Sequence, residues 1–312
     1  MEKFNYYQLS FVGRREENQD SSVALDLGNS CYFLAVADGM GGAAGGQVAS
    51  QLVAKTAQQV LSNSFSTSVE PSNLKDILTE IYLEAQKVIS VKIQSRKDLS
   101  GMGTTLTCVL IQKNKYIVGN LGDSRVYVLS KGTCHQITQD HSYLEDYKNK
   151  SGKEADLNIA EKYGHYLLKS LDGGEDTPDI FPKNEEYYEL KPKDGFLLCS
   201  DGLLPNKSNS HEDMFYKTIM GTQKLQYAAE TLIVNAFNEG STDNITVALG
   251  EYGKFDRTNE KIKRVKYPPV EKKGKTISRK SLGIVASWCL LTVAVLLILF
   301  QKLLFKESKT DV

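Results

Sequence analysis

Four aspartates stand beside strand-like segments, where their carboxylates could bind metal ions. Asp38 follows the apolar segment 31–37, Asp123 follows 116–122, and Asp201 follows 195–200. Asp243 instead precedes the strand-like segment 244–249. Clustered carboxylates repel one another unless cations lie among them, and hard divalent cations prefer oxygen ligands. If these four side chains meet, they form a site for more than one divalent cation.

For a single one of these positions, a plain turn is the more ordinary explanation. Asp38-Gly39 and Asp201-Gly202 are Asp-Gly pairs, which are typical of hairpin turns. The repetition of the pattern favours the metal site. Because the end of one strand lies beside the start of the next in an antiparallel sheet, we expect all four aspartates to share one rim.

The elements that must position these residues follow from the spacing of apolar residues. The pattern predicts strands over 4–12, 31–37, 186–190, 195–200 and 244–249, with three more between 104 and 129. It predicts helices over 44–62, 73–95, 211–220 and 223–238. Strands interleaved with helix pairs indicate a layered α+β sandwich. Segment 139–182 is polar and lacks a clean period, and such long loops are usually lids or binding segments.

Six stretches resemble those of the metal-dependent serine/threonine protein phosphatases of type 2C, in that family's order. They are spread from about residue 5 to residue 250, so the resemblance covers a whole catalytic domain. The stretches are Arg15-Glu-Glu-Asn-Gln-Asp20, Asp38-Gly-Met-Gly-Gly42, Met102-Gly-Thr-Thr105, Gly122-Asp-Ser-Arg125, Leu198-Cys-Ser-Asp-Gly-Leu203 and Asp243-Asn-Ile-Thr246.

The resemblance implies both a fold and a reaction. The fold is a four-layer α-β-β-α sandwich, in which helices flank two antiparallel sheets and the metals lie in the cleft where the sheets meet. The reaction is hydrolysis of phosphoserine and phosphothreonine monoesters by a hydroxide that bridges two cations. Ligands that are all oxygen point to Mn²⁺ or Mg²⁺ rather than zinc.

Each proposed metal ligand is assigned a role. Asp38 bridges the two cations, Asp201 and Asp243 bind one of them, and the Gly39 carbonyl binds the other. The resemblance further implies that Asp20 acts through metal-bound waters, and that Asp123 forms a third, weaker site together with Asp201.

Arg15 is the candidate for binding the phosphate oxygens, because a planar guanidinium can contact two of them at once. An ordinary surface arginine is the alternative, and Arg14 is its direct neighbour. The Arg-x-x-Asn-x-Asp spacing favours Arg15.

Three positions need separate comment. Some family members carry a histidine where this chain has Met40, which cannot donate a proton to the leaving group. Many relatives carry an acidic residue at the position of Gln19, for which we expect a polar supporting role. His141 lies near the start of segment 139–182, which in the family would correspond to a flap beside the active site. We favour a structural role for His141 over a catalytic one.

The bulk composition limits the partners and the compartment. Residues 253–280 carry eleven Lys and Arg against three Asp and Glu, a net charge of +8, and residues 301–312 add +1, which leaves the first 252 residues at a net charge of −9. An acidic catalytic body argues against nucleic acid as a partner. The five cysteines form no C-x-x-C pair, so we expect reduced, buried thiols. No secretory signal opens the sequence.

The sequence divides into four parts: a catalytic domain over 1–252, a basic linker over 253–280, a transmembrane helix over 281–301 and a short tail over 302–312. Residues 281–301 carry no charge over 21 positions, and a helix of that length spans the roughly 30 Å hydrocarbon core. A buried core or oligomerisation helix is the alternative. The basic excess before the helix predicts a single-pass membrane protein whose catalytic domain is cytoplasmic.

Two hypotheses for the function belong to different classes. The first is an active phosphatase tethered to the membrane, and the second is a catalytically silent pseudophosphatase that acts as a membrane-bound regulatory module. The complete set of aspartates favours the first. Phosphoproteins are then the substrates, and by analogy the partners are a Ser/Thr kinase and its targets in bacterial signalling. The sequence leaves the oligomeric state open.

Overall fold

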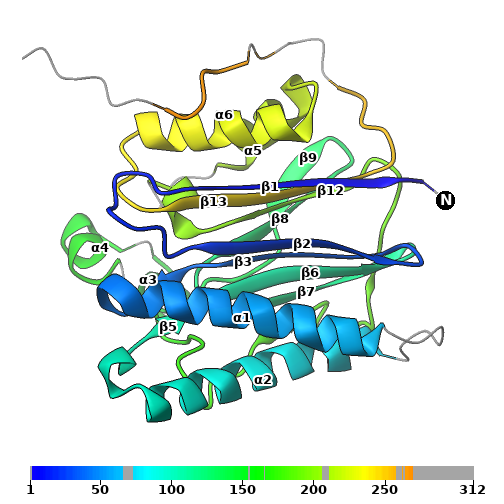
Figure 1. Cartoon of the computed structure of the whole chain (residues 1–312). Coiled ribbons are helices and arrows are strands. Elements are labelled where there is room, and N and C mark those ends of the chain that lie inside the picture. Colours follow the sequence, from blue (N-terminus) through cyan, green and yellow to red (C-terminus); the bar gives the residue numbers. More distant parts are fainter. Residues whose placement is uncertain are drawn as a thin grey trace, which may run out of the picture. The chain divides into compact units, whose positions relative to one another are not determined.

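The computed structural model describes residues 2–65, 73–153, 155–164, 166–205, 211–257, 262 and 264–269. These residues belong to one compact unit, Met1–Pro269. Figure 1 shows its layers: two sheets lie face to face, and a pair of long helices covers each outer face. The predicted α+β sandwich with antiparallel sheets and flanking helices is therefore confirmed.

Both sheets are antiparallel in every strand pairing. In order across the first sheet, the strands are β1 (Phe4–Phe11), β13 (Ile245–Tyr252), β12 (Gly195–Cys199), β8 (Arg125–Ser130) and β9 (Thr133–Gln136). The second sheet has the order β10 (Asp179–Phe181), β7 (Lys115–Leu121), β6 (Leu106–Gln112), β3 (Cys31–Ala37) and β2 (Ser21–Gly28), and β11 (Tyr188–Glu189) also pairs with β7. A short extra pair joins β4 (Gly39–Met40) to β5 (Gly103–Thr104).

Helices α1 (Gly42–Ser64) and α2 (Leu74–Ser95) cover the second sheet, and α5 (Glu212–Gly221) and α6 (Leu225–Asn238) cover the first (Figure 1). Two short helices, α3 (Tyr143–Ser151) and α4 (Leu157–Tyr163), lie at the end of the sandwich where α1 begins (Figure 1). Single 3₁₀ turns occupy Lys97–Leu99 and Asp201–Leu203.

The strands carry apolar residues on both faces because each sheet is covered on both sides. In β3, Phe33 and Ala35 join the core beneath α1 and α2, while Leu34 and Val36 join the core between the sheets. This is the period-2 alternation of a strand with both faces buried. It explains why segment 31–37 is apolar throughout.

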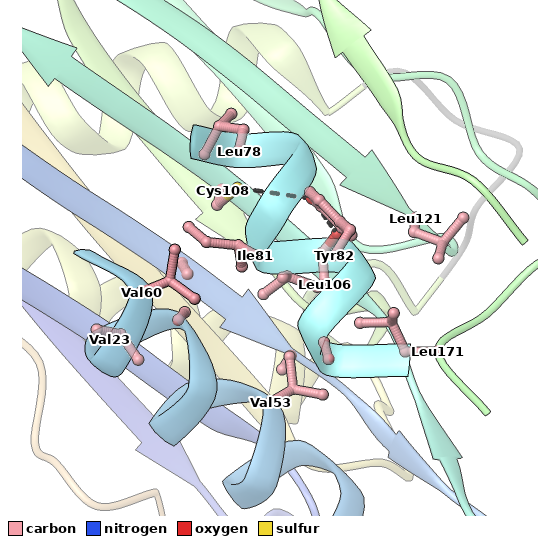
Figure 2. Packing of buried hydrophobic residues seen from close by; sticks show 14 of the residues in the cluster. Val23, Val53, Val60, Leu78, Ile81, Tyr82, Leu106, Cys108, Leu121 and Leu171 are labelled. Carbon is pink, nitrogen blue, oxygen red and sulfur yellow. Dashed lines mark hydrogen bonds between the residues drawn. The ribbon is translucent and has the colours of Figure 1, made fainter. Parts of the chain in front are cut away.

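The core beneath α2 also holds a buried polar contact, drawn in Figure 2. The Tyr82 hydroxyl donates a hydrogen bond to the carbonyl of Leu106 at 3.0 Å and lies 3.5 Å from the Cys108 sulfur. Gly119 in β7 leaves room for this ring, since a Cβ there would lie 2.8 Å from a Tyr82 ring carbon. Tyr82 therefore fixes α2 against two neighbouring strands.

The structure differs from the sequence prediction at strands β2 and β9 and in segment 139–182. Strand β2 was not predicted, because it is an edge strand whose polar and half-buried residues mask the alternation. Segment 139–182 was predicted as a loop, but it contains α3, α4 and β10. The four described cysteines, at positions 31, 108, 134 and 199, are buried and form no disulfide, as expected.

The first part of the predicted linker packs on the catalytic domain. Phe255 is buried, Arg257 donates a hydrogen bond to the Ile219 carbonyl, and Tyr267 packs edge-on against Phe11. Within the described residues no helix is long and apolar enough to cross a membrane. The predicted span 281–301, the tail after it and Cys289 lie outside the described residues.

Candidate active site

Four of the predicted aspartates line one pocket of about 490 Å³: Asp38, Asp123, Asp201 and Asp243. They come from both sheets, so the expectation of a single shared rim is wrong. Asp38 and Asp123 follow β3 and β7. Both strands pair with β6, so they run in the same direction and end at the same end of the second sheet. Asp201 and Asp243 lie where β12 ends and β13 begins, two neighbours in the first sheet. The pocket thus lies at the strand ends of the two sheets, where the sheets meet.

Two threonines hold the backbone of Asp38. The Asp38 N–H donates to the Thr105 hydroxyl at 2.9 Å, and its carbonyl accepts from the Thr105 N–H and the Thr104 hydroxyl, both at 2.8 Å. The Thr105 hydroxyl is also 2.8 Å from that of Ser124, next to Asp123. The Thr105 side chain therefore links the loop that carries Asp38 to the loop that carries Asp123.

Asp243 is positioned by close backbone packing. A Cβ on Gly13 would overlap the Asp243 carbonyl, and one on Gly202 would overlap the Asn244 carbonyl. Only glycine permits such an approach, and Gly13 also has a positive φ of 64°. Asn244 completes the clamp, because its side-chain amide donates to the carbonyls of Val12 and Glu17 at 2.8 and 2.9 Å.

Asp20 is buried behind the pocket. The Ser200 hydroxyl donates to its carboxylate at 2.7 Å, and the Ser200 oxygen itself accepts the Thr246 N–H at 3.0 Å. Burial raises the pKa of Asp20 to about 7, although the hydrogen bonds from Thr246 and Ser200 oppose that rise. Asp201 and Asp243 raise it further, which places the Asp20 carboxylate within their electrostatic reach.

The Asp38 carboxylate is affected both by burial and by the charges of the other aspartates. Its pKa is raised well above the ordinary value, first by burial and then by the negative charges of Asp20, Asp201, Asp123 and Asp243. A carboxyl that is both desolvated and surrounded by like charges favours the protonated form. Positive charge in the pocket would reverse that preference.

Arg15 and the residues after it form the exposed side of the pocket. The Arg15 guanidinium is 2.7 Å from the Asp243 carboxylate, and the two side chains are 57% and 37% exposed. Glu16, Glu17 and Gln19 line the same side. The Gln19 side chain donates to the Gly42 carbonyl at 2.9 Å and so serves a polar supporting role. Arg14 points elsewhere: it lies over the Phe237 ring, 3.9 Å from its centroid.

A buried ion pair supports the Asp123 loop from behind. Arg125 binds Asp140 through two nitrogens, at 2.9 and 2.8 Å, and both side chains are largely buried. The next residue, His141, exchanges two hydrogen bonds with Gly122: its N–H donates to the Gly122 carbonyl at 2.9 Å, and its Nδ1 accepts the Gly122 N–H at 3.2 Å. His141 does not line the acidic pocket, in keeping with a structural role.

The donor set suits a hard divalent cation. Several carboxylates converge on one pocket, the Gly39 segment lines it too, and the acids repel one another as they stand. These side chains do not form a complete coordination shell. Among the described residues, no three acidic, histidine or cysteine side chains lie close enough together to hold an ion.

Sequence reasoning found the charged residues and missed most of their supports. Thr105, Ser124 and Asn244 lie in the six recognised stretches, but no role was predicted for them. Ser200 is one residue before Asp201 and was likewise given none. Their spacing carried no signal for a role, because each acts on a residue from a distant part of the chain.

Comparisons with known proteins agree with this geometry. The family model described as Protein phosphatase 2C matches residues 10–233. The serine/threonine phosphatase Stp of Listeria welshimeri is 32% identical over 243 residues, which are 76% of this chain and 91% of that protein. The serine/threonine protein phosphatase PstP of Mycobacterium tuberculosis is 31% identical over 78% of this chain, which spans 43% of PstP. A crystal structure of the PstP catalytic domain in complex with two manganese ions superposes with a TM-score of 0.66 and 30% identity, covering 80% of this chain and 99% of that one.

Proposed function

This chain belongs to the protein phosphatase 2C family, and we propose that the acidic pocket is where it removes phosphate from phosphoproteins. The chain is a protein serine/threonine phosphatase that depends on Mn²⁺ or Mg²⁺. The observation that carries the assignment of the site is the convergence of Asp38, Asp123, Asp201 and Asp243 on one pocket.

The proposed metal ligands are those assigned from the sequence: the carboxylates of Asp38, Asp201 and Asp243, the Gly39 carbonyl, and, less directly, Asp20 and Asp123. When bound, the cations supply positive charge that neutralises the phosphate dianion and lowers the pKa of the attacking water. Asp38 is central to this assignment, because its charge interacts with those of all four other aspartates.

Arg15 is the proposed phosphate-binding residue. Its contact with Asp243 joins two partly exposed groups, and such pairs contribute only about 0–1 kcal/mol. The guanidinium can therefore exchange Asp243 for a substrate oxygen at little cost. Its planar fork then orients the phosphate toward the carboxylate cluster. Met40 lines the pocket beside it and carries no transferable proton.

The test of the site is Asp38→Asn in the purified full chain. We expect the turnover of p-nitrophenyl phosphate and of a phosphothreonine peptide with Mn²⁺ to fall by a factor on the order of 10²–10³. The matched control is Asp213→Asn on α5, where the side chain is 98% exposed and remote from the pocket. Near-normal rates for Asp38→Asn would remove the assignment.

The silent-module alternative gives a different result in the same assay. A pseudophosphatase would bind the phosphopeptide with no Mn²⁺-dependent turnover, in the wild type as well as in the variants. The acidic pocket gives no support to that alternative, because all the aspartates of the recognised stretches are present.

We also propose that the chain is anchored in a membrane by residues 281–301, with the catalytic domain on the cytoplasmic side. The support is the uncharged stretch of 21 residues and the basic excess before it. Deleting 281–312 should move the protein from the membrane pellet to the soluble fraction with unchanged turnover of p-nitrophenyl phosphate. A truncated chain that stays in the pellet after a carbonate wash would contradict the anchor.

The proposed partner enzyme is a Ser/Thr kinase that catalyses the opposing reaction, and this phosphatase dephosphorylates the targets of that kinase. The support is analogy within the family alone. A kinase gene beside this one would identify the candidate, and the purified phosphatase should then remove phosphate from that kinase. A kinase that keeps its phosphate under these conditions would count against the pairing.

A further inference from the structure

A second cleft, of about 510 Å³, opens beside the catalytic pocket. We call it the side cleft, and its main lining residues are Met40, Ile93, Ser100, Met102, Tyr166 and Leu167. Met40 and Leu167 line the catalytic pocket as well. The two hollows are therefore adjacent, and Met40 and Leu167 line both.

Large hydrophobic side chains line the side cleft and stand exposed beside it. Tyr166 is 52% exposed, and Leu168 beside it is 50% exposed. They are two of the five large hydrophobic residues that are exposed in the described part of the chain. Exposed apolar side chains gathered next to a reactive pocket are typical of a binding surface.

Gly103 lets the Met40 side chain pack closely against the floor of the side cleft. A Cβ there would lie 3.1 Å from the end of the Met40 side chain and 3.3 Å from the Cβ of Asp172. A larger residue at this position would displace the end of Met40. Methionine has a flexible, polarizable side chain that adapts to differently shaped apolar groups.

The wall that carries Tyr166 is fixed by hydrogen bonds. The Tyr166 carbonyl accepts the Tyr143 N–H at 2.9 Å, and the Tyr166 N–H donates to the Tyr163 carbonyl at 3.0 Å. Further along, the Gln86 side chain accepts the Asp172 N–H at 3.1 Å and donates to the Ser170 carbonyl at 3.0 Å. A wall that is already ordered loses little conformational freedom when a ligand binds.

We propose that the side cleft receives an apolar side chain of the phosphoprotein substrate, close in sequence to the phosphorylated residue. This inference rests on the proposed function, because it requires the phosphate to lie among the aspartates. An extended peptide advances about 3.3–3.6 Å per residue, so a residue a few positions away reaches the neighbouring hollow. The side cleft then selects substrates by a side chain that takes no part in the reaction.

Among the described residues that line the side cleft, Asp172 is the one that carries a charge, and its carboxylate is exposed. Its side chain already accepts the Gly174 N–H at 2.9 Å. The remaining lining is apolar, glycine or serine. Leucine, phenylalanine or methionine is therefore the expected occupant, and lysine is the competitor that a test must include.

The test uses phosphothreonine peptides on an alanine background, with one Leu, Ser, Lys or Glu moved through the three positions on each side. The full chain with Mn²⁺ should show one position at which Leu raises kcat/KM by about 10–100-fold over Ser. Tyr166→Ala removes a wall and Ser100→Trp fills the cleft, so each should abolish that preference. Both should leave the turnover of p-nitrophenyl phosphate unchanged, because neither residue lines the catalytic pocket.

Leu83→Ala is the matched control, since Leu83 is 58% exposed on α2 and lies outside the side cleft. It should keep the wild-type preference for Leu. Equal rates for all peptides, a preference for Lys over Leu, or a preference that survives both cleft variants would overturn the inference while the proposed function stands. Loss of turnover on every substrate, p-nitrophenyl phosphate included, would overturn the proposed function and this inference with it.

Discussion

The two sheets each contribute a pair of aspartates to the active site, but they hold those pairs in different ways. At the strand ends of the second sheet, where Gly39 and Gly122 are also closely packed, hydroxyl groups add a tie between the loops: Thr105 bonds to the Asp38 backbone and to Ser124. In the first sheet, glycines let the main chains touch, with Gly13 and Gly202 packed against the Asp243–Asn244 segment. Hydroxyl ties can be removed one bond at a time, whereas a glycine contact leaves no room for any substitution. The two halves should therefore respond differently to mutation.

The largest effect is expected from Gly202→Ala, which disrupts the close packing of Gly202 against the Asp243–Asn244 segment. Its methyl group would overlap the backbone oxygen of Asn244, so the Asp201 and Asp243 loops must separate. Overpacking of this kind costs about 1–3 kcal/mol or more, and turnover should fall on the order of 10²-fold because two carboxylates move. Activity with Mn²⁺ and chemical denaturation measure the two effects.

Gly174→Ala is the matched control for that substitution, because the nearest atom to the new methyl is the end of the exposed Asp172 side chain. It should keep turnover of p-nitrophenyl phosphate close to the wild-type value. If Gly202→Ala behaved like Gly174→Ala, the first sheet would not depend on close backbone packing.

A smaller effect is expected from Thr105→Val, which removes the hydroxyl tie in the second sheet and preserves its shape. The Asp38 N–H loses its acceptor and Ser124 loses a partner, so the affinity for Mn²⁺ should fall by about 10–100-fold. Metal titration of activity measures this change. Thr105→Ser keeps the hydroxyl and should retain most of the affinity, and equal losses in both variants would show that the methyl group matters as much as the hydroxyl.

The same contrast explains how far the sequence could be interpreted alone. Strands such as 31–37 and 195–200 were predictable because they are apolar without interruption, and the Asp-Gly that follows each one could be located with them. Edge strand β2 was not predictable, since only Val23 of its residues is fully buried. The helices of segment 139–182 were missed because α3 buries none of its residues and so shows no apolar stripe.

The supports of the active site could not be derived from spacing. Thr105 lies 67 residues from Asp38, and Ser200 lies 180 residues from Asp20. Such pairs are set by which strands neighbour each other, and single-sequence periodicity does not encode strand order. The charged residues were found because their types and neighbours are distinctive, whereas a threonine or serine in a strand is not.

A third prediction tests whether the core beneath α2 affects stability without affecting the aspartates at the strand ends of the second sheet. Tyr82→Phe removes the hydroxyl that bonds to the Leu106 carbonyl beneath α2 (Figure 2). The free energy of unfolding should fall by about 1 kcal/mol, the usual contribution of a buried hydrogen bond, with kcat unchanged. Denaturant melts and steady-state assays measure the two quantities. A clear loss of kcat would mean that the core beneath α2 controls the position of the aspartates.

The smallest effect concerns another tie in the second sheet, between His141 and Gly122. Burial lowers the pKa of His141, helped by Lys169 and opposed by Asp179 and Asp140, so the folded protein favours the neutral ring. Its Nδ1 accepts the Gly122 N–H and its Nε2 lies 3.3 Å from Asp179, an arrangement that requires a proton on Nε2 alone. The unfolded chain binds a proton near the ordinary pKa of 6.5, so the stability that this group contributes is present above pH 6.5 and is lost as the pH falls through the lowered pKa.

His141→Asn keeps an acceptor near Gly122 and cannot titrate, so its unfolding free energy should decline less between pH 7 and pH 5 than that of the wild type. One group can change that slope by at most about 1.4 kcal/mol per pH unit. Denaturant melts at several pH values in EDTA measure the slope, and His135→Asn is the control because His135 is exposed on β9. If His141→Asn and the wild type lost stability in parallel, the neutral ring would not be what joins the flap to the Asp123 loop. The Asp123 loop would then depend on Thr105 and the Arg125–Asp140 pair for its geometry.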